Sequence, residues 1–203
     1  MLYLVIIIAG NLLISALNMI FDPAGFVPAG HLRIWYLAIS VAFTITAVAI
    51  DGLAAFVIRK MPEKYFDPDR KHFGTSQKRI KRYRKLGIKK WKSKVPELGG
   101  FTSFHKDKVR KPNDDEYVGR YMLEACYGIV IHEVSVPAGF LLIPLSLLIF
   151  MKFPLITLTV ALPVAAVNAV LIYAPAMVLR YNLPKLKILR ERNKSRSKNS
   201  GGF

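Results

Sequence analysis

Cysteine is almost absent from this chain, because Cys126 stands alone among 203 residues and leaves no disulfide framework and no CxxC metal site. The histidines, at positions 31, 72, 105 and 132, have no zinc-ligand spacing. The sequence contains no GxGxxG, P-loop or GxSxG motif and no solenoid-type repeat. These absences exclude the enzyme classes that depend on those motifs, and we expect neither a metal nor a bound cofactor.

Charge is nearly absent from four long apolar stretches, each close to the roughly 20 residues that a helix needs to cross a bilayer. Of the 30 Lys and Arg residues, 19 lie between Arg59 and Lys111 and 8 between Arg180 and Lys198. A bilayer excludes charged residues from the segments that cross it, whereas a water-soluble fold does not require such long uncharged stretches. The sequence therefore predicts an all-α, polytopic membrane protein with four transmembrane helices, at residues 1–21, 35–58, 128–150 and 154–179.

The position of the cations predicts the orientation of these helices, since cytoplasmic loops collect Lys and Arg. Residues 59–118 and 180–203 are then inside, and an even number of spans places the N-terminus inside as well. The outer connections, Asp22–Arg33 and Lys152–Pro154, each carry one cation. We expect a multi-pass protein of the cell membrane with both termini cytoplasmic. Its segments are two N-terminal spans (1–58), a basic cytoplasmic loop (59–118), a candidate catalytic helix with two C-terminal spans (119–180) and a basic cytoplasmic tail (181–203).

The most basic stretch, SQKRIKRYRKLGIKKWKSK at residues 76–94, spaces apolar residues among its cations. This pattern predicts a basic amphipathic helix over 78–94 that lies on the membrane surface, with Trp91 as an aromatic anchor. Anionic headgroups attract such a segment by about 1 kcal/mol per cation. A phosphate-bearing ligand would suit the same surface, and composition does not separate the two. Because the cations flank membrane helices, membrane lipids and not nucleic acid are the expected partners of this +17 chain.

Polar residues inside the spans have two interpretations. Asn11, Ser15 and Asn18 share one helical face, which either packs against another helix or contacts a substrate. Asp51 lies about two turns from the cytoplasmic end of the second span, where a charge is costly. It either pairs with Arg59 or a residue of another helix, or it takes part in chemistry. The fourth span is predicted to leave the membrane at 180–182, before Pro184.

One stripe of residues spaced by four, Glu116, Arg120, Glu124, Gly128 and His132, has the composition of a catalytic site. Arg120 can pair with Glu124. Glu124 and His132 are about 12 Å apart along a helix and can frame one cleft, with Gly128 leaving room between them. Histidine has an ordinary pKa of about 6.5, which suits a base at neutral pH. A charge network that caps the helix at the bilayer edge explains the same spacing equally well.

Three short motifs carry a resemblance to a known family. They are GIKKWKSKVPELGGF at 87–101, Tyr121–Glu124 followed by Ile131–His132, and Arg180–Tyr181–Asn182 followed by Pro184. In this order they resemble the glycosyl-4,4′-diaponeurosporenoate acyltransferases of staphyloxanthin biosynthesis, which are small bacterial membrane proteins. The resemblance covers roughly residues 60–192. Glu133 replaces an aromatic residue of the family pattern, and the two N-terminal spans are fuller.

The resemblance implies acyl transfer from a thioester donor, acyl-CoA or acyl-carrier protein, to a hydroxyl of a membrane glycolipid or related lipid. In such a reaction we expect His132 to be the base and Glu124 to orient His132 or the acceptor, and the hypothesis for the donor to the oxyanion is Asn182 or Trp91. Two alternatives remain: another lipid-modifying enzyme that uses His132, or a non-catalytic membrane scaffold or transport subunit. The acceptor, the donor carrier, the oligomeric state and the roles of Glu133 and Asp51 stay open. The implied substrate-binding residues are Trp91, Lys92, Lys94, Arg120, Arg180, Tyr181 and Asn182.

Overall fold

The computed structural model describes residues 2–25, 34–95 and 109–200, and within them it contains helices and no strand. Four helical stretches are long and apolar enough to cross a membrane, as the sequence predicts. The later part of the predicted first outer loop, at 26–33, and residues 96–108, which include the end of the first motif, lie outside the described residues. The four stretches are Tyr3–Phe21, Trp35–Arg59, Asp115–Ile149 and Thr157–Ser197.

The chain forms two compact units. The first contains Met1–Phe56 and His132–Tyr173, and the second contains Val57–Ile131 and Ala174–Phe203. Three helices pass from one unit into the other: α2 (Trp35–Arg59), α5 (Asp115–Gly139) and α7 (Leu162–Ser200). Each unit therefore combines ranges that are distant in the sequence, whereas the four predicted segments are consecutive along the chain.

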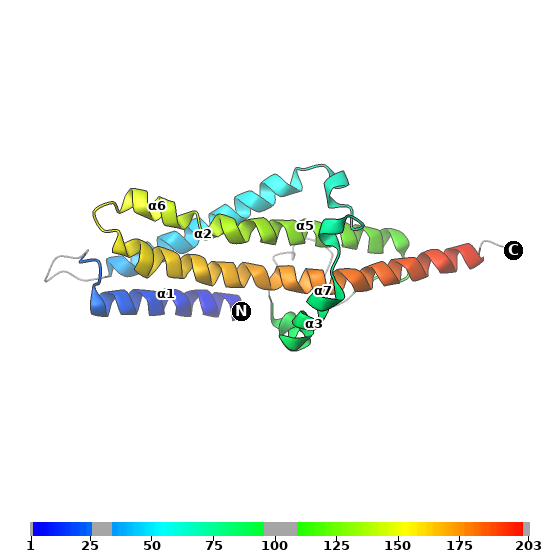
Figure 1. The fold of residues 1–203 in the computed structure, drawn as a ribbon, viewed down its shortest axis with the longest axis horizontal. Helices are drawn as coiled ribbons and strands as arrows, with labels where there is room; N and C mark the ends of the chain where they lie inside the picture. Colours follow the sequence, from blue (N-terminus) through cyan, green and yellow to red (C-terminus); the bar gives the residue numbers. More distant parts are fainter. Residues whose placement is uncertain (1, 26–33, 96–108, 201–203) are drawn as a thin grey trace. The chain divides into compact units, whose positions relative to one another are not determined.

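The first unit packs α1 (Leu2–Phe21) alongside the beginning of α7 (Figure 1). The Asn18 side chain of α1 donates to the Thr159 carbonyl at 2.9 Å, within the π-helical turn Thr157–Ala161 that precedes α7. Large apolar side chains point outward, with Leu13 61% and Ile45 64% exposed. Water-soluble proteins rarely leave such a continuous apolar surface, so these faces suit contact with lipid.

The predicted third span is divided in two. α5 continues from Asp115 to Gly139, and the short α6 (Leu142–Ile149) follows after a tight turn at Phe140 and Leu141. Pro137 has no N–H to donate within α5, and the Phe140 and Leu141 amides donate to carbonyls only three residues back. The helix therefore tightens and ends, a change of direction that hydrophobic composition does not reveal.

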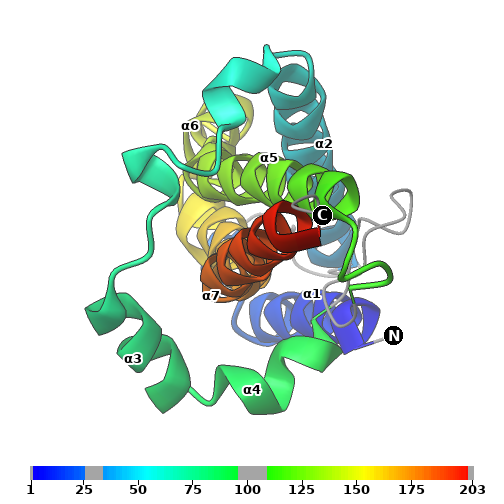
Figure 2. The same ribbon diagram turned by 90° about the vertical axis from the view of Figure 1, so that its right-hand side faces the viewer.

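The second unit contains the basic segment, which is not the single helix expected over 78–94. It consists of α3 (Gln77–Lys85), α4 (Ile88–Trp91) and a 3₁₀ turn (Lys92–Lys94). Gly87 interrupts it with a φ of 67°, a left-handed conformation that glycine adopts without strain. Figure 2 shows α3 and α4 following one another, and they pack against the middle part of α7. Tyr83 and Ile88 are buried there against Tyr181.

α7 continues without a break through Pro184 to Ser200. Pro184 cannot donate to the Arg180 carbonyl four residues earlier, but the Thr75 hydroxyl donates to that carbonyl at 3.1 Å. The helix continues because another segment satisfies the group that proline leaves unpaired. Lys187 pairs with Asp69 at 2.9 Å and lowers the pKa of that carboxyl by its hydrogen bond.

Candidate active site and donor-binding residues

Glu124 lies at the centre of an ion-pair network in the second unit. Its Oε2 accepts from Arg59 Nη1 at 3.1 Å, and its Oε1 accepts from Arg120 Nη2 at 3.2 Å. Arg120 also donates to Glu63 at 2.9 Å. The predicted pair of Arg120 with Glu124 is confirmed, and Arg59 pairs with Glu124 instead of Asp51. Because a cation holds each of its oxygens, Glu124 is a fixed anion.

Aromatic residues surround this network and fix its supporting segments. The Tyr127 ring stacks on Phe66, with 3.9 Å between ring centroids, and the Tyr127 hydroxyl donates to the Met61 carbonyl at 3.2 Å. The Arg59 guanidinium lies 5.9 Å from the centre of the same ring. These contacts tie the end of α2 and the 3₁₀ turn Glu63–Phe66 to α5. The arrangement supports the interpretation of the charges as a structural network at the helix edge.

Gly128 does not leave an open space on α5, contrary to the sequence interpretation. A Cβ atom added at this position would lie 2.7 Å from Leu179 Cδ1. The absence of a side chain therefore lets α5 and α7 approach closely, which is the usual role of glycine between membrane helices. The spacing of Gly128 between Glu124 and His132 reflects helix packing.

His132 belongs to the first unit, on the part of α5 that enters it. The side chain is partly buried, and its Nδ1 atom is buried without a hydrogen-bond partner among the described residues. One turn further along α5, the buried Ser135 hydroxyl lies close to the Asp51 carboxyl group of α2. Glu133 is partly buried.

Asp51 is held by a residue of another helix, which was one of the two pairings expected. Its Oδ2 accepts from the Asn168 amide of α7 at 3.2 Å. Its Oδ1 is buried, and the Ser135 hydroxyl of α5 lies close to the carboxyl group. The Asp51 carboxyl group is thus positioned by residues of both α5 and α7.

The polar face of α1 packs against α2, as one interpretation of its spacing predicts. Asn11 Oδ1 accepts from the Ser40 hydroxyl at 2.6 Å and from the Thr44 hydroxyl at 3.1 Å. Asn11 and Thr44, together with Asn168, line a cavity of about 30 Å³ whose other walls are largely apolar. A cavity of this size holds one or two water molecules and no substrate. These residues are structural.

Of the residues that the resemblance assigns to substrate binding, Trp91 and Tyr181 meet where the basic segment packs on α7 in the second unit. Trp91 is partly buried, and its indole N–H donates to the Leu86 carbonyl at 2.9 Å. Lys92 is partly buried and Lys94 is exposed. Trp91 and Tyr181 belong to one apolar cluster, so the structure brings the first and third motifs together.

Within the third motif, Arg180 is 4% exposed, and its guanidinium donates to the His72 carbonyl at 3.0 Å. Tyr181 is 2% exposed, and the Lys185 ammonium lies 3.9 Å from the centre of its ring. Asn182 is partly buried. Arg180 therefore supports the 3₁₀ turn Lys71–Phe73, while Tyr181 lies beneath cations. Sequence reasoning missed Lys185, although its spacing of four residues from Tyr181 on a helix indicates the contact.

No three His, Cys, Asp or Glu side chains within 2–25, 34–95 and 109–200 come together in a way that could hold a metal ion.

Comparison with known proteins identifies one family. Residues 62–192, more than half of the chain, match the family model CrtO, described as glycosyl-4,4'-diaponeurosporenoate acyltransferase. No curated protein and no solved structure gives a significant match. The matched range contains Glu124, His132 and the third motif and omits Asp51. The family name indicates acyltransferase activity in carotenoid glycolipid biosynthesis. The chain belongs to the glycosyl-4,4'-diaponeurosporenoate acyltransferase family.

Proposed function

We propose that this protein transfers a fatty acyl group from a thioester donor to a hydroxyl group of a membrane glycolipid. The family match supports acyl transfer, and the four apolar helices suit a lipid acceptor. The observation that carries the proposal is the buried Nδ1 of His132, which has no hydrogen-bond partner in the described residues. A buried polar atom without a hydrogen-bond partner costs free energy, so its presence in an apolar helix indicates a functional role.

His132 is the proposed general base. Its imidazole removes the proton of the acceptor hydroxyl as that oxygen attacks the carbonyl carbon of the thioester. A carbon–oxygen bond forms, the carbon–sulfur bond breaks, and the thiolate leaves with the proton that His132 returns. The products are an acylated lipid and a free thiol. General base catalysis of this kind contributes about 10²–10⁴ in rate.

Glu124 is proposed as a positioning residue and not as a second base. Its two oxygens are occupied by Arg59 and Arg120, so it holds these cations and the surrounding segments in place. The Trp91 indole N–H is donated to the Leu86 carbonyl, so Trp91 is not proposed as a donor to the oxyanion.

We further propose that the protein is a multi-pass protein of the cell membrane with both termini in the cytosol. The split of Lys and Arg between the inner and outer segments supports this orientation. The donor would then arrive from the cytosol as acyl-CoA or acyl-carrier protein and meet the basic segment 76–94. The acceptor lipid would arrive laterally from the membrane.

The test is acyl transfer by the purified protein in liposomes, with a labelled acyl thioester and an extracted glycolipid fraction as acceptor. His132→Ala should reduce turnover by about 10²-fold or more because the base is lost. Glu124→Gln should have a smaller effect, since the amide oxygen still accepts from one arginine. Normal turnover by a folded, membrane-inserted His132→Ala protein would remove this residue from the mechanism.

A further inference from the structure

The segment from Ser76 to Val95 contains ten Lys and Arg residues and no acidic residue. Its apolar side chains, Tyr83 and Ile88, are buried against Val178 and Tyr181 of α7. The apolar face of the segment is therefore used within the protein. The cations lie on the other faces of the segment. Gly87, with its positive φ, makes the turn between α3 and α4, and both helices pack against α7.

Two of these cations, Arg84 and Lys89, lie around Tyr181 together with Lys185 of α7, and Lys92 lies near Lys185. The Lys185 ammonium lies 3.9 Å from the centre of the Tyr181 ring. Lys185, Lys89 and Arg84 interact electrostatically with the Tyr181 hydroxyl, and Lys92 interacts electrostatically with Lys185. They come from α7, α4, α3 and the 3₁₀ turn, so four separate elements contribute one cation each.

This convergence lacks an internal counter-ion among the described residues. Four acidic groups of the second unit form ion pairs with other cations. Asp69 pairs with Lys187, and Asp115 pairs with Arg190. Glu63 and Glu124 belong to the network around Arg120. Like charges held close together raise one another's free energy, and an anion placed between them removes that cost.

We propose that Arg84, Lys89, Lys92 and Lys185 form a phosphate-binding site around Tyr181. Arginine and lysine are the side chains that hold phosphate oxygens, through charge-assisted hydrogen bonds. Four cations match a group with several negative charges, such as a nucleotide carrying a diphosphate and a phosphomonoester. The identification of this ligand with the soluble end of the acyl donor rests on the proposed function, whereas the phosphate site itself does not.

Arg180 is separate from this site although it is the neighbour of Tyr181. Its guanidinium is buried and donates to the His72 carbonyl, and its own carbonyl accepts from Thr75. Arg180 therefore fixes the preceding loop, and it orients the segment that presents Arg84 and Lys89. The site depends on Arg180 for its position and on the other four cations for its contacts.

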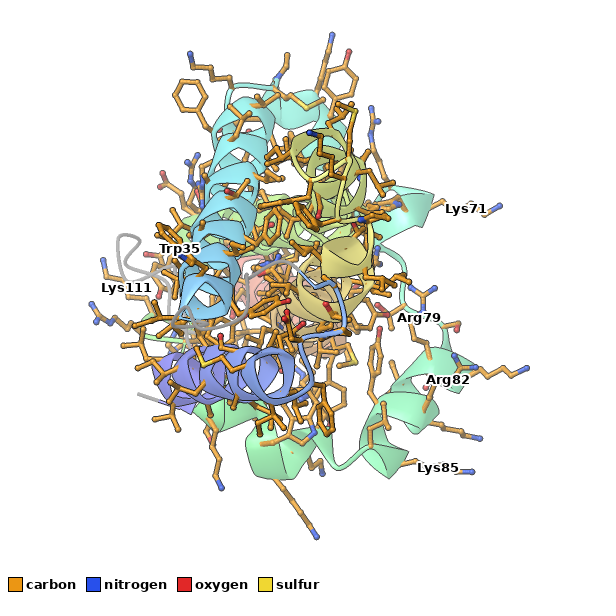
Figure 3. The ribbon with its side chains drawn as sticks, turned by 90° about the vertical axis from the view of Figure 1, so that its left-hand side faces the viewer. Trp35, Lys71, Arg79, Arg82, Lys85 and Lys111 are labelled. Atoms are coloured by element: carbon orange, nitrogen blue, oxygen red, sulfur yellow. The ribbon has the colours of Figure 1, made fainter. Side chains whose placement is uncertain are left out.

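The test measures the Kd of adenosine 3′-phosphate 5′-diphosphate for the full-length protein in nanodiscs of neutral lipid. The double variant Arg84→Ala/Lys185→Ala should weaken binding by about tenfold or more, since hydrogen bonds to charged groups are lost. The matched control is Arg82→Ala/Lys85→Ala, which removes the same charge. Figure 3 shows Arg82 and Lys85 pointing outward from α3. Lys185→Gln, which keeps much of the side chain over Tyr181, provides a second variant if the first one unfolds.

Equal weakening by the site variant and its control would show a general electrostatic effect and overturn the proposal. A second arm uses phosphatidylglycerol as probe and measures its retention by native mass spectrometry. If the protein retains this lipid through the same residues and does not bind the nucleotide, the site stands with a lipid headgroup as its ligand. His132→Ala should bind the nucleotide normally. If the wild-type protein binds the nucleotide but transfers no acyl group, the phosphate site stands and the proposed acyltransferase function is refuted.

Discussion

The contact between Thr75 and α7 leads to a prediction about how the third motif is stabilised. Pro184 leaves the Arg180 carbonyl without its helical donor, and the Thr75 hydroxyl donates to it at 3.1 Å. We change Thr75 to Val, which keeps the shape of the side chain and removes the hydroxyl. The Arg180 carbonyl then belongs to a residue that is 4% exposed and has lost this donor.

The cost of this change follows from the burial of the carbonyl. An unsatisfied buried acceptor costs about 1–3 kcal/mol, and the partial burial of Thr75 favours the lower part of that range, about 1–2 kcal/mol. Pro184→Ala restores an N–H that can donate to Arg180 from within the helix. In the Pro184→Ala background, Thr75→Val should therefore cost less, and the coupling energy between the two positions should be about 1 kcal/mol.

The assay is urea unfolding of the purified protein in detergent micelles, with the free energy of unfolding obtained by linear extrapolation. Thr75→Ser is the matched control because it keeps the hydroxyl and should retain most of the stability. The four proteins of the double-mutant cycle are the wild type, each single variant and the double variant. If Thr75→Val costs the same in the wild type and in the Pro184→Ala background, the two positions are uncoupled and the reasoning is wrong.

Three further predictions concern packing, the second span and topology. Gly128→Ala should lower the free energy of unfolding by about 1 kcal/mol, because the new Cβ displaces Leu179 Cδ1 from 2.7 Å; an unchanged urea midpoint would contradict this. Asp51→Asn should keep acyl transfer within a few-fold, because the new amide oxygen can still accept from Asn168. If Asp51→Asn abolished transfer while His132→Ala did not, the chemistry would belong to α2. Cysteine placed at the exposed Lys111 should resist an impermeant thiol reagent added to intact cells, with the buried native Cys126 as an internal blank, and labelling from outside would overturn the orientation.

The spans could be predicted from the sequence because hydrocarbon imposes a strong rule on composition, but the ends of the helices could not. α5 begins at Asp115, since the Asp114 side chain accepts from the Tyr117 N–H as an N-cap does. It ends at Gly139, where the Phe140 and Leu141 amides donate to carbonyls only three residues back. α7 passes through Pro184 because Thr75, more than 100 residues earlier, satisfies the freed carbonyl. Such long-range compensation is invisible to a local pattern.

The same division holds for the candidate site. The pair of Arg120 and Glu124 follows from a spacing of four on a helix, so the sequence predicts it. The partners Arg59 and Glu63 lie far away in the sequence and emerge only when α2 packs on α5. The interpretation of Gly128 as open space was wrong. A glycine in the sequence does not tell whether a ligand or a neighbouring side chain such as Leu179 occupies the space beside it. Arg84, Lys89 and Lys92 were predicted as part of a basic surface, whereas Lys185 was missed, and their arrangement around Tyr181 includes a turn at Gly87 that the sequence analysis did not predict.

The most direct measurement of the central claim is lipid composition in cells that express the wild-type protein, the His132→Ala variant or neither. We predict a glycolipid whose mass increases by one fatty acyl group when the wild-type protein is present. This product should be absent, and its unacylated precursor should accumulate, with His132→Ala at equal protein abundance. An identical set of acylated lipids in all three cultures, or an identical product with wild type and His132→Ala, would contradict the account.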